Sequence, residues 1–227
     1  DQHTAYVRKH PTDSDREYLQ HVFETVAALP VLGALYDKRN NPLWLFGPSA
    51  DGAQILLTFW QQADATTGTL RHNFTDASGD TRFLGDLYQD LSESARKRYA
   101  LLQTPVFVEE FILERTLDPA IETFGLAKVR MIDPTCGSGH FLLGAFNRIL
   151  GRWQKAEPGT NVIELVRRTL DAIYGVDINP YAAAIARFRL LISALRACQI
   201  TKVRSAPAWK IHAVAGDSLL LGPEPTQ

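Results

Sequence analysis

The sequence has little cysteine, little methionine and no long apolar run. Its two cysteines, Cys136 and Cys198, give neither a disulfide framework nor a zinc-ligand spacing. The six histidines form no HExxH motif and no paired spacing, so we expect no metal site. The apolar stretches fall far short of the roughly 20 residues that span a bilayer. These absences predict a cytoplasmic protein with no membrane segment and no signal peptide.

A surplus of charge of either sign is also missing. Lys and Arg number 24 and Asp and Glu number 25, which leaves a formal net charge of -1. A protein that binds nucleic acid by itself normally carries a basic surplus, so we expect any nucleic-acid role to be local or completed elsewhere. The 45% of hydrophobic residues is typical of a globular chain. Because the only methionine is Met131, we expect the chain to be a piece of a longer protein.

Residues 1–83 carry mixed signals that favour a mostly helical N-terminal region. Residues 13–17 (DSDRE) predict a helix start, and the apolar residues that follow share one helix face: Leu19, Val22, Phe23 and Val26. Residues 54–62 form an apolar run typical of a second helix, and Asn41-Pro42 is typical of a turn. Further helices are predicted at residues 90–98 and after Thr104-Pro105, the latter with Val108, Phe111 and Ile112 on one face.

Beyond residue 125, short strands alternate with helices. Strands are predicted at residues 129–132, 172–176 and 211–215. The helix after the first strand has the spacing of a buried face at Leu142, Ala145, Phe146, Ile149 and Leu150, and a short helix at 161–170 follows. Asn179-Pro180 opens another helix, with Ile185, Phe188, Ile192 and Leu195 predicted to face inward. This alternation is typical of an α/β fold with a parallel sheet and right-handed crossovers.

Each predicted strand ends at or next to an aspartate, where α/β sheets bind their ligands. After the first strand, Gly137 and Gly139 allow backbone N–H groups to approach a polar ligand closely. Asp177 follows the second strand, where a carboxylate accepts hydrogen bonds from a ribose diol. Asp217 follows the third strand and is placed to accept from the exocyclic amine of an adenine.

Two common adenosine ligands do not fit this pattern. A dinucleotide fingerprint requires a third glycine at the position of Leu142, and no Gly-Lys-Ser/Thr of a phosphate-binding loop follows the turn. The pattern therefore favours an adenosine ligand without phosphates. Cys136 is expected to be a small buried hydrophobe rather than a nucleophile, and His140 is expected to face solvent.

The motifs resemble those of a known family. Asp133-Pro134-Thr135-Cys136-Gly137-Ser138-Gly139-His140-Phe141 is similar to the cofactor motif of class I S-adenosylmethionine-dependent DNA methyltransferases of the N6-adenine type. Thr104-Pro105, residues 174–180 (YGVDINP) and residues 215–218 (AGDS) resemble other motifs of that family, in the family's order. Residues 83–91 and 102–111 are most similar to the phage growth-limitation (bacteriophage exclusion) adenine methyltransferases.

The resemblance implies an incomplete Rossmann-like sheet and a cofactor, S-adenosyl-L-methionine. Thr104 and the Gly137–Gly139 turn would hold the amino-acid end of the cofactor, Asp133 would organise the turn, and Asp177 would bind the ribose. Asp217 and Ser218 would read the adenine, and Ile178 and Phe141 would give apolar contacts. The residues that the resemblance assigns to cofactor binding are Thr104, Pro105, Asp133, Thr135, Gly137, Ser138, Gly139, Phe141, Asp177, Ile178, Asp217 and Ser218.

The family's catalytic Asn/Asp-Pro-Pro-aromatic motif does not occur in the sequence. Asn179-Pro180-Tyr181 lacks one proline and fits a helix cap better, and Asn41-Pro42 fits a turn. The resemblance therefore implies a helical region at 1–83 and, at 84–227, the cofactor-binding part of a methyltransferase domain that is truncated before the catalytic motif. The catalytic residues and most contacts to double-stranded DNA would lie beyond Gln227, and the strand at 129–133 would be an unpaired edge.

The function that follows from the resemblance is site-specific DNA adenine N6-methylation in a phage-defence or restriction-modification system, with defence-system proteins as further partners. The chain itself is expected to bind the cofactor weakly and to be inactive alone. Two alternatives stay open. The chain is a non-catalytic interaction module with a methyltransferase fold, or it belongs to an RNA or protein methyltransferase with the same cofactor motifs.

Overall fold

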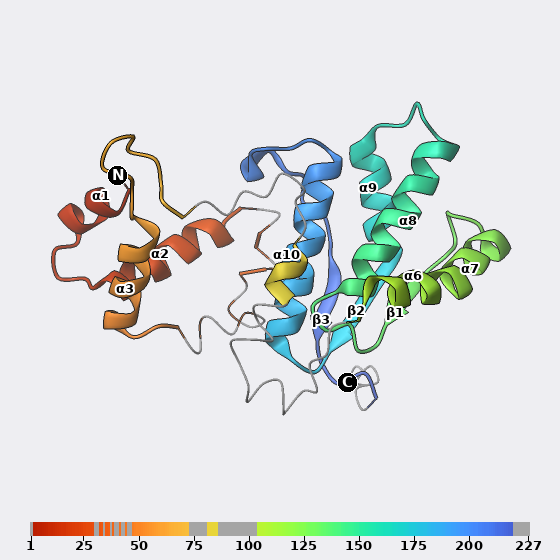
Figure 1. Ribbon diagram of the computed structural model, residues 1–227, viewed down its shortest axis with the longest axis horizontal. Coiled ribbons are helices and arrows are strands. Elements are labelled where there is room, and N and C mark those ends of the chain that lie inside the picture. Colours follow the sequence, from red (N-terminus) through yellow and green to blue (C-terminus); the bar gives the residue numbers. More distant parts are fainter. Residues whose placement is uncertain are drawn as a thin grey trace, which may run out of the picture. The chain divides into compact units, whose positions relative to one another are not determined.

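The computed structural model (Figure 1) describes residues 2–29, 32–33, 35–36, 38, 41, 44, 47–72, 81–85 and 104–219. The predicted helix at 90–98 and most of the segment 83–91 lie outside these residues. The chain divides into two compact units, residues 1–80 and residues 81–227. No helix in the described part of the chain is both long and apolar enough to cross a membrane.

The first unit is helical, with α1 (Gln2–Lys9), α2 (Asp15–Ala27) and α3 (Ala50–Trp60). The predicted start of α2 is confirmed, because Ser14 forms a capping box with Glu17 at its N-terminus. The second predicted helix begins earlier than expected, since the Ser49 hydroxyl accepts a hydrogen bond of 3.1 Å from the Gly52 amide and so caps α3 at residue 50. Helices α2 and α3 pack together.

The second unit contains a parallel three-stranded sheet in the order β1-β2-β3, made of β1 (Met131–Asp133), β2 (Ile173–Asp177) and β3 (His212–Ala215). The predicted α/β class and the three strands are confirmed, although each strand begins one or two residues later than its pattern indicated. Asp133 pairs with Gly175, and Asp177 pairs with Ala215. Within the described residues β1 is an edge strand, as predicted.

Helices cover one face of this sheet. Helices α8 (His140–Ala156) and α10 (Pro180–Ala197) contact β2 and each other, and α9 (Val162–Leu170) packs on α8 (Figure 1). A single-turn 3-10 helix, η2 (Val203–Ser205), precedes β3. On the opposite face of the sheet, Ile132 is 63% exposed and Val214 is 49% exposed. The core of the unit therefore lies between the strands and the α8/α10 layer.

The buried face of α8 is as predicted, but that of α10 is not. All five residues predicted for the α8 face are buried: Leu142, Ala145, Phe146, Ile149 and Leu150. In α10, only Leu195 of the four predicted residues is fully buried, and Ile185, Phe188 and Ile192 are partly exposed. Small side chains face the sheet instead: Ala182, Ala183, Ala186 and Ala194. They let α10 approach the strands and the turn after β1 closely.

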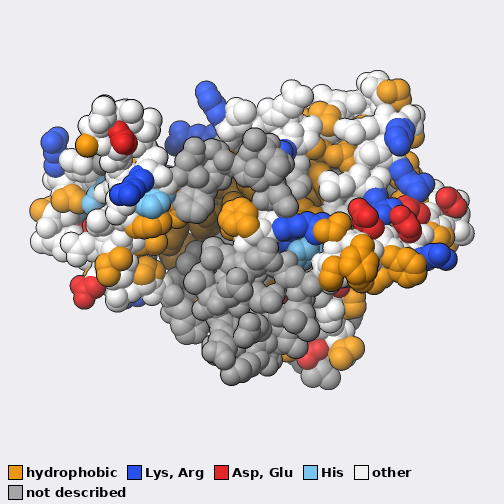
Figure 2. All heavy atoms as spheres, viewed as in Figure 1, with side chains coloured by type: hydrophobic (Ala, Val, Ile, Leu, Met, Phe, Trp, Pro, Cys, Tyr) orange, Lys and Arg blue, Asp and Glu red, His pale blue; other side chains and the backbone are white. Residues whose placement is uncertain are grey.

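Helices α6 (Val106–Arg115) and α7 (Leu117–Phe124) lead into β1. The predicted helix with Val108, Phe111 and Ile112 on one face is confirmed, but this face is not the buried one, because α6 packs on α8 through Glu109 and Leu113. Apolar residues surround α6, so the sequence pattern could not distinguish its inner face from its outer face. Several exposed apolar side chains lie on α6 and α7, among them Phe107, Phe111 and Phe124. Figure 2 shows hydrophobic side chains on the surface of the molecule.

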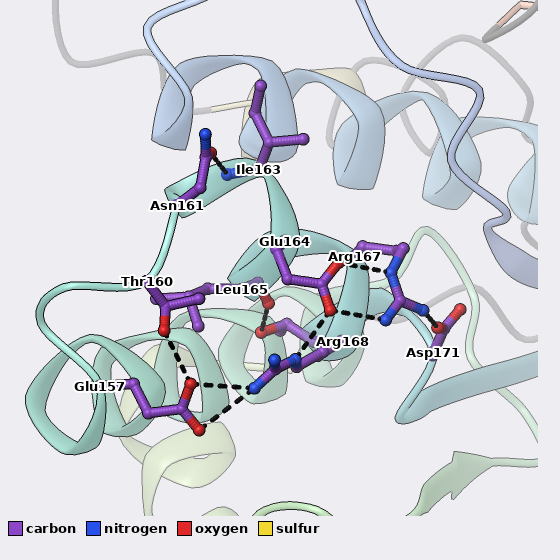
Figure 3. A network of polar contacts seen from close by, with 10 residues as sticks. Glu157, Thr160, Asn161, Ile163, Glu164, Leu165, Arg167, Arg168 and Asp171 are labelled. Carbon is purple, nitrogen blue, oxygen red and sulfur yellow. Dashed lines mark hydrogen bonds and ion pairs between the residues drawn. The ribbon is translucent and has the colours of Figure 1, made fainter.

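A chain of ion pairs fixes α9 (Figure 3). The Glu164 carboxylate accepts hydrogen bonds from both Arg167 and Arg168, and these bonds lower the pKa of Glu164 to about 2. Arg168 also donates a hydrogen bond to the Glu157 carboxylate, and Arg167 also donates one to the carboxylate of Asp171, the C-cap residue of α9. The Asn161 side chain accepts from the Ile163 amide and caps the helix. These contacts lie within α9 and its caps, and the bond from Arg168 to Glu157 connects α9 to the C-cap residue of α8.

Two glycines of α8 predict opposite effects of the same substitution. A Cβ atom at Gly144 would overlap the Glu109 carboxylate and lie 2.6 Å from Leu113 Cδ1, whereas a Cβ at Gly151 would meet nothing within 4 Å. We expect Gly144→Ala to lower the free energy of unfolding by about 1–3 kcal/mol, because the α6/α8 contact must open. We expect Gly151→Ala to raise it by up to about 1 kcal/mol through helix propensity. Chemical denaturation followed by circular dichroism measures both, and equal effects would contradict the packing described.

Candidate functional site

The turn after β1 is held against β2 by backbone hydrogen bonds. The Cys136 amide donates to the Val176 carbonyl at 2.9 Å, which extends the β1/β2 ladder into the turn. The Gly137 amide donates to Asp177 Oδ2 at 2.7 Å. Gly137 (φ 51°) and Gly139 (φ 87°) both have the left-handed conformation that glycine adopts without steric cost. The two glycines singled out in the sequence therefore make the turn possible.

Asp177 joins three elements at the carboxyl edge of the sheet. Its Oδ2 atom accepts from the Gly137 amide, and its Oδ1 atom accepts from the Asn179 amide at 2.8 Å. Its carbonyl accepts from the Gly216 amide at 2.9 Å, which draws the end of β3 toward β2. A carboxylate offers about four lone-pair positions, so each oxygen keeps acceptor capacity beyond these bonds.

Asp133 ends β1 beside Asp177. The Asp133 carboxylate accepts from the Thr135 amide at 3.1 Å. Burial raises the pKa of Asp133 above its usual range, and the charge of Asp177 adds to this effect. A cation placed beside these two carboxylates would lower the pKa of Asp133 again, so the pair provides an electrostatic reason for binding positive charge.

Asp217 lies at the same edge of the sheet, two residues after β3. Its Oδ1 atom accepts from the Leu219 amide at 2.9 Å, and Ser218 between them is exposed. Ile178 follows Asp177 and is 63% exposed, so an apolar side chain is presented at this edge. The structure thus brings Asp133, Asp177 and Asp217 to one edge of one sheet, together with the turn.

A groove of about 420 Å³ lies beside β1 and is lined by apolar residues of α6 and α7. Asp133, Pro134 and Phe141 border it, whereas Asp177 and Asp217 do not. The groove therefore meets only one end of the predicted site. Its other walls include Ile112, Leu113, Leu117 and Ile132.

Thr104 and Pro105 come just before α6, with Pro105 in an extended conformation at the N-cap position. The predicted helix after Thr104-Pro105 is confirmed, and it begins at Val106. The Pro105 carbonyl accepts the first two helical bonds, from Val108 and Glu109. Among the described residues no hydrogen bond joins Thr104 to the turn.

The two Asn-Pro pairs have structural roles. Asn179 is fully buried, and its side chain accepts hydrogen bonds from the Tyr181 and Ala182 amides, which confirms that it caps α10. Asn41 is buried and donates to the Leu35 carbonyl at 2.8 Å. Neither amide is placed at the strand tips by these contacts. No group of three metal-ligating side chains occurs among the described residues.

His140 contradicts its prediction, because it is buried in the first turn of α8 rather than exposed. The local sequence places His140 directly after the turn but does not show that α6 and α10 enclose that end of α8. The sequence interpretation also missed Arg189 and Glu109, two charged residues buried close to the turn. The sequence signal that could have identified them is a charged residue within a largely apolar stretch of a predicted helix.

Comparison with known proteins supports the motif assignment. Residues 120–210 match the family model described as "MmeI, DNA-methyltransferase domain". The chain is 49% identical over 95% of its length to the adenine-specific methyltransferase PglX of Streptomyces coelicolor.

The chain is thus a relative of the adenine-specific methyltransferases. It is also 29% identical, over 72% of its length, to a protein of Methanocaldococcus jannaschii whose name describes a type II restriction enzyme and methyltransferase. The chain spans 18% of the length of PglX and 14% of the archaeal protein. The predicted resemblance to this family is confirmed, and relatives of this kind imply a methyl-donor cofactor.

Cys136 is expected to be unreactive in the folded protein. Its thiol is buried in the turn, and burial raises the pKa of Cys136 to about 12, with Asp133 and Asp177 contributing. Below that pH the thiol stays protonated, and the thiolate is the nucleophile. Labelling with iodoacetamide at pH 8, read by mass spectrometry, should modify the less buried Cys198 first. In denaturant the two rates should become similar, and fast labelling of native Cys136 would contradict the assignment.

Proposed function

We propose that residues 84–227 form the S-adenosylmethionine-binding part of a site-specific DNA adenine N6-methyltransferase of a phage-defence or restriction-modification system, preceded by a helical region at 1–83. In this proposal the three strands belong to an incomplete Rossmann-like sheet of the class I methyltransferase type. One observation carries the proposal: the Asp177 carboxylate holds the glycine turn and the start of α10 together at the sheet edge that Asp133 and Asp217 share.

The residues at this edge fit S-adenosylmethionine in charge and in hydrogen-bonding capacity. A Cβ atom added at Gly137 would meet nothing within 4 Å, so the turn faces open space on the side where a ligand approaches. No Lys or Arg occurs from Asp133 to Asn147, which suits a cationic sulfonium and not a pyrophosphate. The carboxylates of Asp133, Asp177 and Asp217 provide negative charge for a cation and hydrogen-bond acceptors for a ribose diol and an exocyclic amine.

Each residue has one proposed role in binding. Asp177 accepts hydrogen bonds from the ribose hydroxyls with the lone pairs that its backbone bonds leave over. Asp217 and Ser218 contact the adenine, and Ile178 packs on it. The turn residues Thr135, Gly137, Ser138 and Gly139 hold the amino-acid end, with Asp133 and Phe141 beside them and with Thr104 and Pro105 contributing from the start of α6.

When bound, S-adenosylmethionine supplies an electrophilic methyl group. The residues described here bind and orient it at the edge of the sheet, where its charge is balanced by carboxylates. Methylation of an adenine amine within DNA also requires that the base leaves the stack and that acceptors bind its N6 protons. The chain has no Asn/Asp-Pro-Pro-aromatic motif for that step. We propose that the whole protein provides it, with double-stranded DNA as its substrate.

Calorimetry on the full-length protein that contains this chain tests the proposal. S-adenosylhomocysteine, which carries the same ribose and adenine, should bind the unchanged protein, and Asp177→Ala should weaken binding by about ten- to a hundredfold through the lost charged hydrogen bonds. Asp171→Asn is the matched control. Asp171 begins the same segment at the opposite end of β2 and pairs with Arg167 on the surface, so its substitution should leave the affinity unchanged. Equal affinity in Asp177→Ala and the parent would overturn the ribose assignment.

A further inference from the structure

Arg189 is an arginine buried in the middle of α10. It is 1% exposed, in a helix whose buried residues are otherwise alanines, leucines and Arg187, which donates to the Ala213 carbonyl of β3. Burying a guanidinium is costly unless its N–H groups are hydrogen-bonded and its charge is compensated. The positions of its partners therefore indicate what this residue does.

The guanidinium of Arg189 bonds to the glycine turn. Its Nη1 atom donates to the Ser138 carbonyl at 2.7 Å and to the Ser138 hydroxyl at 3.2 Å. Its Nε atom donates to the Thr81 hydroxyl at 3.1 Å. Arg189 thus joins α10, the turn and the segment at residues 81–85, and 51 residues of chain separate it from Ser138.

A buried carboxylate compensates this charge. Glu109 of α6 is 4% exposed and bonds to Arg82 at 3.2 Å, next to the Thr81 that Arg189 contacts. Burial raises the pKa of Glu109, while the charges of Arg82 and Arg189 act in the opposite direction. Gly144 leaves the space on α8 that the Glu109 carboxylate occupies. The two arginines and Glu109 form one polar cluster inside the unit.

We propose that Arg189 is a positioning residue for the cofactor turn. Asp177 holds the turn from the strand side through the Gly137 amide, and Arg189 holds it from the helix side through the Ser138 carbonyl. These two contacts fix the Cys136–Gly137 and Ser138–Gly139 peptide groups, and a Cβ atom at Gly137 would still meet nothing within 4 Å. The inference rests on the proposed function, because it assigns the turn to S-adenosylmethionine.

The test compares Arg189→Met with Arg148→Met in the full-length protein. Arg148 on α8 bonds to Asp118 of α7 at 2.7 Å and to the Glu110 carbonyl, so its loss also removes contacts between helices but does not touch the turn. Thermal unfolding measures stability, and calorimetry with S-adenosylhomocysteine, at a temperature where all variants are folded, measures affinity. Methylation kinetics add KM for the cofactor and kcat.

We expect Arg189→Met to weaken binding by at least about tenfold and to raise KM for the cofactor similarly, with kcat at saturation changed by less than about twofold. Arg148→Met should lower the melting temperature without changing the affinity. If Arg189→Met does not fold, the affinity of Thr81→Val is measured instead. This nearly isosteric substitution removes one hydrogen-bond partner of Arg189 and should weaken binding about threefold.

The outcomes distinguish a failure of the inference about Arg189 from a failure of the proposed function. If the unchanged protein binds the cofactor analogue and Arg189→Met, or Thr81→Val in its place, binds equally well, Arg189 has only a structural role and the inference is wrong. If both arginine variants weaken binding in proportion to their loss of stability, the inference is also wrong. If the unchanged protein does not bind the analogue at all, the proposed function fails and the inference fails with it.

Discussion

The hydrogen bond from the Gly137 amide to the Asp177 carboxylate determines the arrangement of the whole sheet edge. It connects residues that are 40 positions apart, and the second Asp177 oxygen begins α10 through Asn179. The Asp177 carbonyl holds the exit of β3 through Gly216. Because one residue contacts all three segments, the turn, the helix and the third strand cannot shift independently. Hydrogen bonds within the chain therefore set the spacing of these segments at this edge of the sheet.

Contacts on the helix side give the site its rigidity. The sheet is covered by α8 and α10 on one face, while Ile132 and Val214 on the other face are largely exposed. Parallel sheets are usually covered on both faces. In this chain the turn is bonded to β2 through the Cys136 and Gly137 amides and, on the covered side of the sheet, to Arg189 of α10.

The sequence predicted the parts of this structure that local patterns determine. The strands, the glycine turn, the caps at Ser14 and Asn179 and the buried face of α8 follow from periodicity and capping chemistry. Periodicity did not predict the buried faces of α6 and α10. Apolar residues occur on every side of α6, and α10 buries alanines that carry little periodic signal. The burial of His140 and Arg189 depends on segments distant in the sequence, which no local pattern contains.

The contact between Gly139 and Ala186 sets the distance between the turn and α10. A Cβ atom at Gly139 would lie 2.9 Å from the Ala186 Cβ, and Gly139 also has a φ of 87°. With glycine and alanine at this contact, the turn and α10 are already as close as side chains allow. The turn and α10 therefore cannot come closer together, and a displacement of the helix toward the turn would also displace the turn.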